Sequence, residues 1–141
     1  MYRTTIYYKY NEVRYIESQY NEPQYKALQC IIGVSRMDAH IRKVYVPMTE
    51  TGFYILLCLQ EEMHGYSIGQ KVGELTDGEI RISPGTMYGT LSKMEKDGLI
   101  QFVREEEKRK TYHITELGQE VLQLEMKRIR RLYRNVEESC I

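Results

Sequence analysis

Residues 83–98 restrict the fold more than any other stretch of the chain, because they mark both ends of one helix. Ser83 is a favourable N-cap and Pro84 suits the first helical position, while Asp97-Gly98 marks the end. At 100° per residue the apolar side chains fall within about 60° of one another. These are Met87, Leu91 and Met94. We therefore expect a helix with one side in the core.

The opposite side of this helix is small, polar and basic. Gly85, Gly89, Ser92, Lys93 and Lys96 lie there, with Thr86, Tyr88 and Thr90 on its flanks. Glycines leave room for close approach of another molecule, hydroxyls form hydrogen bonds with bases or phosphates, and lysines attract phosphates. An ordinary solvated helix face is the alternative. We take this face, together with Ser83, as the candidate DNA-contacting surface.

Two further helices are expected before residue 83. The first begins at the Thr49 cap with Glu50 in its first turn, and it ends near residues 61–62. The apolar run at residues 53–59 predicts burial on more than one face. The second spans residues 66–75, where Gly69 and Gly73 should permit close packing against a neighbour, and His64 should shape the turn before it.

A hairpin follows, with strands expected at residues 99–104 and 111–115. Between them, residues 105–110 form a charged tip whose cations Lys108, Arg109 and Lys110 are either solvated or bound to phosphates. Tyr112 is expected to pack within the sheet.

A long terminal helix closes the chain. It is capped by Thr115 and is expected over residues 116–138, which makes it roughly 33 Å long. A helix of this length extends beyond a core of this size, so its apolar stripe needs a partner. The stripe contains Leu117, Val121, Leu122, Leu124, Ile129, Leu132, Tyr133 and Val136.

This order of elements predicts a mainly α (α+β) fold: a winged helix-turn-helix with a two-stranded wing and a long C-terminal dimerisation helix. In that module the third helix enters the major groove and the wing follows the backbone. Arg42 and Lys43, which precede the first helix, are candidates for an arm that contacts DNA. We expect the DNA-binding domain at residues 37–115 and the dimerisation helix at residues 116–141.

Composition excludes several other classes of protein. The chain has 20 Lys plus Arg and 20 Asp plus Glu, so it is not uniformly basic. Its longest apolar run has seven residues, too few for a membrane span, and no secretory signal is visible. Three scattered cysteines and three separated histidines predict no disulfide framework, metal site or cofactor. The scattered cysteines favour the reducing cytoplasm as the compartment. No catalytic constellation is present, so we expect a protein that is not an enzyme.

Residues 1–36 form a separate, tyrosine-rich region. Tyr10, Tyr15, Tyr20 and Tyr25 recur every five residues, which matches neither a strand nor a helix, and no helical period is convincing before residue 46. Gly33-Val34 can be encoded by a sequence that resembles a bacterial ribosome-binding site shortly before Met37. Two hypotheses stay open: a flexible native arm, or an upstream extension that is not native.

The ordered motifs of residues 42–138 together resemble the PadR family of bacterial transcriptional regulators. The matching stretches are Thr49-Glu50, Phe53-Tyr54-Ile55-Leu56, His64-Gly65-Tyr66-Ser67-Ile68, Ser83-Pro84-Gly85-Thr86-Met87-Tyr88-Gly89-Thr90-Leu91, Asp97-Gly98-Leu99-Ile100, Arg109-Lys110-Thr111-Tyr112 and Ile114-Thr115-Glu116-Leu117-Gly118. No single stretch is decisive, and residues 1–36 fall outside the resemblance.

The resemblance implies a homodimer in which the last and first helices cross those of the second copy, so Phe53, Leu56 and Leu57 join the candidate dimerisation residues. It also implies an inverted-repeat operator, mostly repression, and release by small phenolic or hydrophobic inducers or by membrane stress. The chain is similar to the short C-terminal form of the family. Some short members place drugs between two tryptophans, and this chain has no Trp. A ligand-sensing or protein-interaction dimer without DNA binding is the alternative.

Overall fold

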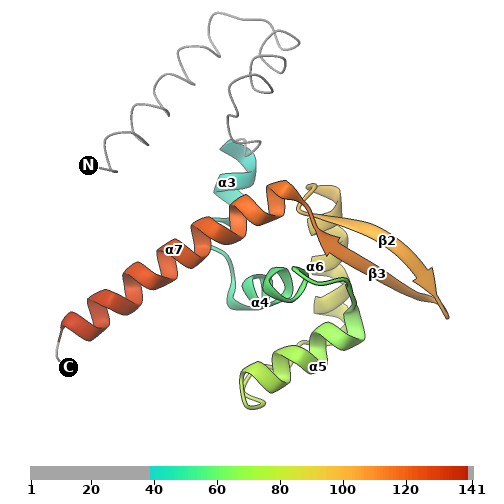
Figure 1. The fold of residues 1–141 in the computed structure, drawn as a ribbon, viewed down its shortest axis with the longest axis horizontal. Helices are drawn as coiled ribbons and strands as arrows, with labels where there is room; N and C mark the ends of the chain where they lie inside the picture. Colours follow the sequence, from blue (N-terminus) through green and yellow to red (C-terminus); the bar gives the residue numbers. More distant parts are fainter. Residues whose placement is uncertain (1–38, 140–141) are drawn as a thin grey trace, which may run out of the picture. The chain divides into compact units, whose positions relative to one another are not determined.

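Residues 39–139 are described by the computed structural model, and within them five helices accompany a three-stranded antiparallel sheet, which contacts α5, α6 and α7 (Figure 1). The expected 1–36 extension lies outside the described residues. The elements are α3 (Ala39–Tyr45), α4 (Glu50–Cys58), β1 (Met63–His64), α5 (Gly65–Leu75), α6 (Pro84–Lys96), β2 (Ile100–Glu106), β3 (Arg109–Ile114) and α7 (Glu116–Glu138). The winged-helix order expected from the sequence is confirmed.

Side-chain caps fix the start of four helices, because each satisfies a backbone N–H that has no intrahelical acceptor. The Gly52 amide donates to the Thr49 hydroxyl at 3.1 Å, and the Thr86 amide donates to the Ser83 hydroxyl at 3.3 Å. The Gly118 amide donates to Thr115 at 3.1 Å, which confirms the three caps expected from the sequence. His64 caps α5, since its Nδ1 accepts from the Ser67 amide at 3.3 Å.

The core gathers around α4, which packs against α5 on one side and α7 on the other. Ile55, Leu56 and Leu59 from this region are fully buried, as are Ile68 of α5 and Leu91 of α6. Burying each side chain of this size contributes about 1.5–3 kcal/mol. The three-helix unit that presents α6 is therefore held by an apolar cluster rather than by surface charge.

Three expectations about the elements were wrong. Residues 39–45 form the helix α3, although no helical period was convincing there. Helix α4 ends at Cys58 rather than near residues 61–62, and the segment after it supplies the short strand β1. β1 pairs with β3 through Met63 opposite Tyr112 and His64 opposite Thr111, so the sheet has three strands in the order β1-β3-β2.

The wing is also longer than expected, because its strands continue through the charged residues. Glu105 lies opposite Lys110 and Glu106 opposite Arg109, so opposite charges face each other across the hairpin. Only Glu107 and Lys108 form the turn, with φ of 50° and 62°. Positive φ at both central residues is typical of the tight turn that matches strand twist.

Gly118 is the position at which α7 joins the sheet most closely. A Cβ built on Gly118 would overlap the backbone carbonyl of Leu99 and lie 2.7 Å from Ile114 Cγ1. No larger residue fits there without a backbone shift. This approach fixes the direction in which α7 leaves the core.

Part of the expected dimerisation set belongs instead to the core of the single chain. Leu56, Val121 and Leu122 have an exposed fraction of 0% within this chain. Their side chains are covered by neighbouring elements of the same copy, so they have no surface to offer a second one. Phe53, Leu57, Leu117 and Leu124 are half-buried.

No helix among residues 39–139 combines the length and apolar character that crossing a bilayer requires.

Candidate nucleic-acid interface

Helix α6 divides its surface as its sequence period predicts. Met87, Leu91 and Met94 are buried in the core. The residues on the other side are exposed, with Thr90 half-buried. They are Ser83, Gly85, Thr86, Tyr88, Gly89, Ser92, Lys93 and Lys96. We call these eight residues and Thr90 the recognition face.

Gly85 and Gly89 leave the backbone of the recognition face uncovered by side chains. A Cβ built on Gly85 or on Gly89 meets no heavy atom within 4 Å. The fold itself therefore does not require glycine at either position, and Gly89 in a helix interior costs about 1 kcal/mol relative to Ala. What the two residues provide is a backbone that another molecule can approach closely.

One end of the recognition face is braced against α3. The Tyr45 hydroxyl donates to Asp97 Oδ2 at 2.6 Å, and the Lys93 ammonium lies 5.4 Å from the centre of the Tyr45 ring. Burial and the Asp97 carboxylate both raise the pKa of Tyr45, so this phenol stays protonated. Lys93 keeps an exposed ammonium group while its position is fixed by an aromatic ring.

The wing is held by contacts at its base and along one strand. Arg104 forms ion pairs with Glu62, next to β1, and with Glu106. The Arg109 guanidinium lies 5.7 Å from the centre of the Tyr66 ring on α5. The sequence did not reveal this Arg109 contact, since the two residues are far apart along the chain. Lys108 and Lys110 are exposed.

Tyr112 packs within the wing, as expected. It is buried and faces Phe102 across the hairpin, with the ring centres 6.4 Å apart in an edge-to-face arrangement. Burial raises the pKa of Tyr112 and keeps its hydroxyl protonated.

Arg42 and Lys43 lie in the last turn of α3 and are exposed. They belong to a helix that Tyr45 fastens to α6, rather than to a loose arm. Arg42 and Lys43 therefore belong to an ordered helix whose Tyr45 contacts Lys93 and Asp97.

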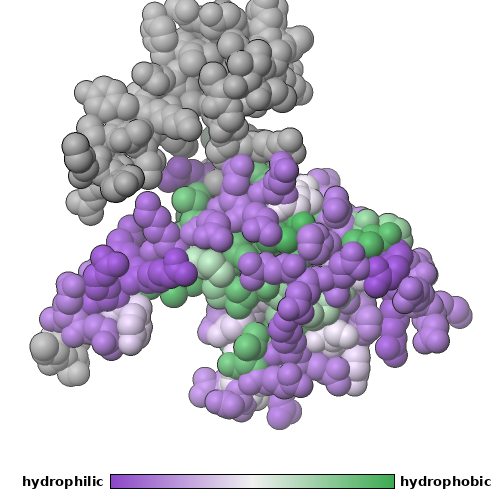
Figure 2. Space-filling view, viewed as in Figure 1, coloured by the Kyte–Doolittle hydropathy of each residue, from purple (hydrophilic) through white to green (hydrophobic). Residues whose placement is uncertain are grey.

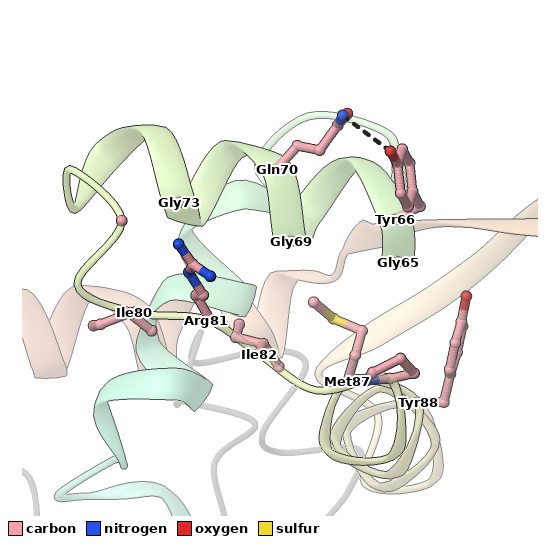
Figure 3. Close-up of a pocket in the computed structure, with 12 residues that line it drawn as sticks. Gly65, Tyr66, Gly69, Gln70, Gly73, Ile80, Arg81, Ile82, Met87 and Tyr88 are labelled. Carbon is pink, nitrogen blue, oxygen red and sulfur yellow. Dashed lines mark hydrogen bonds between the residues drawn. The ribbon is translucent and has the colours of Figure 1, made fainter.

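A groove of about 540 Å³ separates α5 from α6 and the loop before it (Figure 3). Gly65, Gly69 and Gly73 lie along the α5 side, and the loop from Ile80 to Ile82 lies opposite with the Arg81 side chain. Met87 and Tyr88 rise from α6 toward the same space. Gly73 meets no neighbour within 4 Å, so the expected close packing at this residue was wrong.

The second half of α7 lies beyond the core. Glu125 is the last fully buried residue of the helix, and its carboxylate accepts two bonds from the Arg128 guanidinium Nε and one from Nη2, at 2.9–3.1 Å. Beyond it, a row of large apolar side chains is exposed on the described chain. These are Ile129, Leu132, Tyr133 and Val136, with exposed fractions of 37–64%.

Among residues 39–139, no group of three His, Cys, Asp or Glu side chains is placed to hold a metal ion. Cys58 is buried, and burial raises the pKa of its thiol, which makes it a poor nucleophile. The described chain exposes the recognition face on α6 and the apolar row on α7.

Comparisons with known proteins agree with this geometry. The model of the transcriptional regulator PadR-like family matches residues 55–124, which extend from α4 into α7. Transcriptional regulator Rv3488 of Mycobacterium tuberculosis is 36% identical over 78 residues, covering 53% of this chain and 70% of that protein. A PadR family transcription regulator of Clostridium difficile has a similar structure, with a TM-score of 0.58 and 25% identity, covering 66% of this chain and 100% of that one.

Some relatives are much longer than the matched region. Transcriptional regulator YqjI of Escherichia coli is 27% identical over 82 residues, which cover 58% of this chain and 40% of YqjI. An uncharacterised 37.1 kDa protein of a Streptomyces fradiae transposon is 28% identical over 89 residues, which cover 62% of this chain and 25% of that protein. The chain thus spans less than half the length of these two relatives. The chain belongs to the PadR-like family of transcriptional regulators.

Proposed function

We propose that this regulator binds duplex DNA as a homodimer, with the recognition face of α6 in the major groove. The main support is that this face is exposed, has two glycines with open space above them, and presents hydroxyls and two lysines. Such groups suit base edges and phosphates. The wing would follow the adjacent backbone through Lys108 and Lys110, while Arg42 and Lys43 would reach phosphates from the α3 side.

The apolar row of α7 supports the homodimer. Four large apolar side chains exposed along one helix side form a patch that a soluble monomer rarely leaves uncovered. A second copy that pairs its own α7, and the half-buried Phe53, Leu57, Leu117 and Leu124 near it, would cover this patch. Two-fold pairing of this kind places two recognition faces on successive grooves, so the operator would be an inverted repeat.

We further propose that the protein acts in the cytoplasm as a repressor released by a small hydrophobic or phenolic inducer. The groove between α5 and α6 has a volume within the range of small-molecule sites, and Ile80, Ile82 and Met87 give it apolar walls. Tyr88 borders both this groove and the recognition face. A ligand can shift binding only by its different affinity for the bound and released states.

Selection of duplexes from a random-sequence pool, followed by fluorescence anisotropy at several salt concentrations, tests the proposal. We expect the selected site to contain two inverted half-sites, to bind far more tightly than scrambled DNA, and to lose affinity steeply with salt. Absence of any sequence preference would contradict the proposal and favour the alternative, a ligand-sensing or protein-interaction dimer without DNA binding.

A further inference from the structure

The second half of α7 has a basic stripe on the side opposite its apolar row. Lys127, Arg130, Arg131 and Arg134 follow the spacing i, i+3, i+4, i+7, which places all four within about 100° of one another on a helix. All four are exposed, and Figure 2 shows strongly hydrophilic side chains over this part of α7. The helical period of the sequence alone places these four side chains on one side of the helix.

Few carboxylates lie beside the four cations. No Asp or Glu occurs between residues 126 and 136; Glu125, before the stripe, is buried and bound to Arg128, and Glu137 and Glu138 follow the stripe in the last turn of α7. None of the four forms an ion pair or hydrogen bond with another residue in the range 39–139. In a chain with a formal net charge of zero, this is a concentrated patch of positive charge.

The basic stripe points away from both the core and the apolar row. The buried residues Gly118, Val121, Leu122 and Glu125 define the core side of α7, and the apolar row continues that side toward the C-terminus. A second copy paired on the apolar row would leave the basic stripe uncovered. The stripe is also separate from the recognition face, because α7 packs against α4 and β3 while α6 packs against α5 and β2.

We propose that the basic stripe binds the phosphate backbone of a second DNA segment, distinct from the segment held by the recognition face. This inference rests on the proposed DNA-binding homodimer. All four side chains are positively charged at neutral pH, and clustered positive charge attracts the phosphate backbone. Contacts to phosphates alone have no sequence preference, so this second surface accepts any duplex.

The same geometry argues against a membrane surface as the occupant. A helix that lies on a bilayer buries its apolar side among the lipids. In the proposed dimer that side is already covered by the second copy. The dimer instead presents two outward basic stripes, which allows one regulator to hold its operator and a neighbouring stretch of DNA together.

Three full-length variants separate the two DNA surfaces. The first replaces Arg130, Arg131 and Arg134 by glutamine, the second replaces the same three by lysine, and the third is Lys93→Gln with Lys96→Gln on α6. Sedimentation velocity and circular dichroism confirm that each remains a folded oligomer like the wild type. Anisotropy then measures binding of a mixed-sequence 30-base-pair duplex against salt concentration, and immobilised selected operator measures capture of a second, labelled duplex.

We expect the triple-glutamine variant to keep binding the selected operator but to lose capture of the second duplex. Its salt slope on mixed-sequence DNA should fall by about two to three units, since each lost phosphate contact removes roughly 0.9. The triple-lysine variant should retain both properties, because it preserves the charge. Unchanged capture and slope in the triple-glutamine variant, or equal loss in the triple-lysine variant, would overturn the proposal.

The remaining arms identify other failures. If the Lys93→Gln and Lys96→Gln variant binds operator as well as the wild type does, the proposed function of the recognition face fails. The proposal for the basic stripe is tested separately, by comparing the triple-glutamine variant with the triple-lysine variant. Vesicles with anionic phosphatidylserine provide the membrane comparison. Binding to these vesicles that depends on the three arginines, with DNA capture unaffected, would replace the DNA proposal by a membrane contact.

Discussion

At the scale of single residues, the glycines of α6 connect the stability of the protein with its proposed function. Gly89 lies in a helix interior where an added methyl group meets nothing within 4 Å. Glycine therefore lowers the stability of the helix at a position where the fold could accept alanine. This loss of stability is explained if DNA must approach the helix backbone closely at Gly89. The opposite effects expected on folding and on binding make the explanation testable.

Gly89→Ala should raise the free energy of unfolding by about 1 kcal/mol, because alanine is the better helix former. The same change should weaken operator binding roughly tenfold, equivalent to about 1.4 kcal/mol. Urea unfolding and anisotropy measure the two quantities. Gly73→Ala is the matched control, since its methyl group also enters open space but on α5, away from the recognition face. Equal operator affinity in both variants would show that Gly89 is not approached by DNA.

At the scale of elements, a hydrogen bond between residues far apart in sequence links α3 to α6. The phenol of Tyr45 is buried and donates to Asp97, the C-cap of α6. This bond aligns α3 and its cations Arg42 and Lys43 with the recognition helix. Its removal should therefore affect stability first and DNA binding second.

Tyr45→Phe should lower the free energy of unfolding by about 1 kcal/mol near neutral pH, the usual contribution of one hydrogen bond. The raised pKa of Tyr45 also gives a pH signature. The stability that the Tyr45 phenol contributes is complete below the ordinary tyrosine pKa of 10.0. It is lost as pH rises from there toward the folded-state pKa, because the phenol ionises first in the unfolded chain. Denaturant unfolding between pH 8 and 11 should show that the difference in free energy of unfolding between the wild type and Tyr45→Phe shrinks above pH 10. A constant difference would contradict this role.

Local signals in the sequence identified most elements, while contacts between distant residues decided the rest. Thr49, Ser83 and Thr115 cap helices through amides three residues away, so their neighbours sufficed to predict them. Strand β1 has two residues and exists only because β3 pairs with it. The wing strands extend through the charged tip, where Glu105 and Glu106 lie opposite Lys110 and Arg109, and neither strand alone reveals this register.

The candidate site shows the same division. The helical period placed the exposed and buried sides of α6 correctly, because exposure follows directly from 100° per residue. The period could not show that Lys93 lies over Tyr45, or Arg109 over Tyr66, since each pair joins separate elements. Likewise, the apolar stripe of α7 gave no indication of where the core ends, so Val121 and Leu122 were assigned to the dimer although they pack within one copy.

At the scale of the whole molecule, the account requires two copies held by the exposed half of α7. Leu132→Glu with Tyr133→Glu should convert the dimer to a monomer at micromolar concentration, because charges would lie in the apolar contact. The domain should stay folded, since both side chains lie outside the core. Sedimentation velocity and circular dichroism report the two properties. Lys127→Glu, on the opposite side of the same helix, is the control and should remain dimeric; an unaltered dimer in the double variant would place the interface elsewhere.

The central claim is that two recognition faces contact one side of a duplex in the major groove. Protection of guanine N7 from dimethyl sulfate, measured on the selected operator, tests this claim most directly because N7 lies in that groove. We expect two symmetric protected patches about one helical turn apart, both lost in the Lys93→Gln and Lys96→Gln double variant. Full reactivity of every guanine under saturating protein, or protection that the double variant retains, would contradict it.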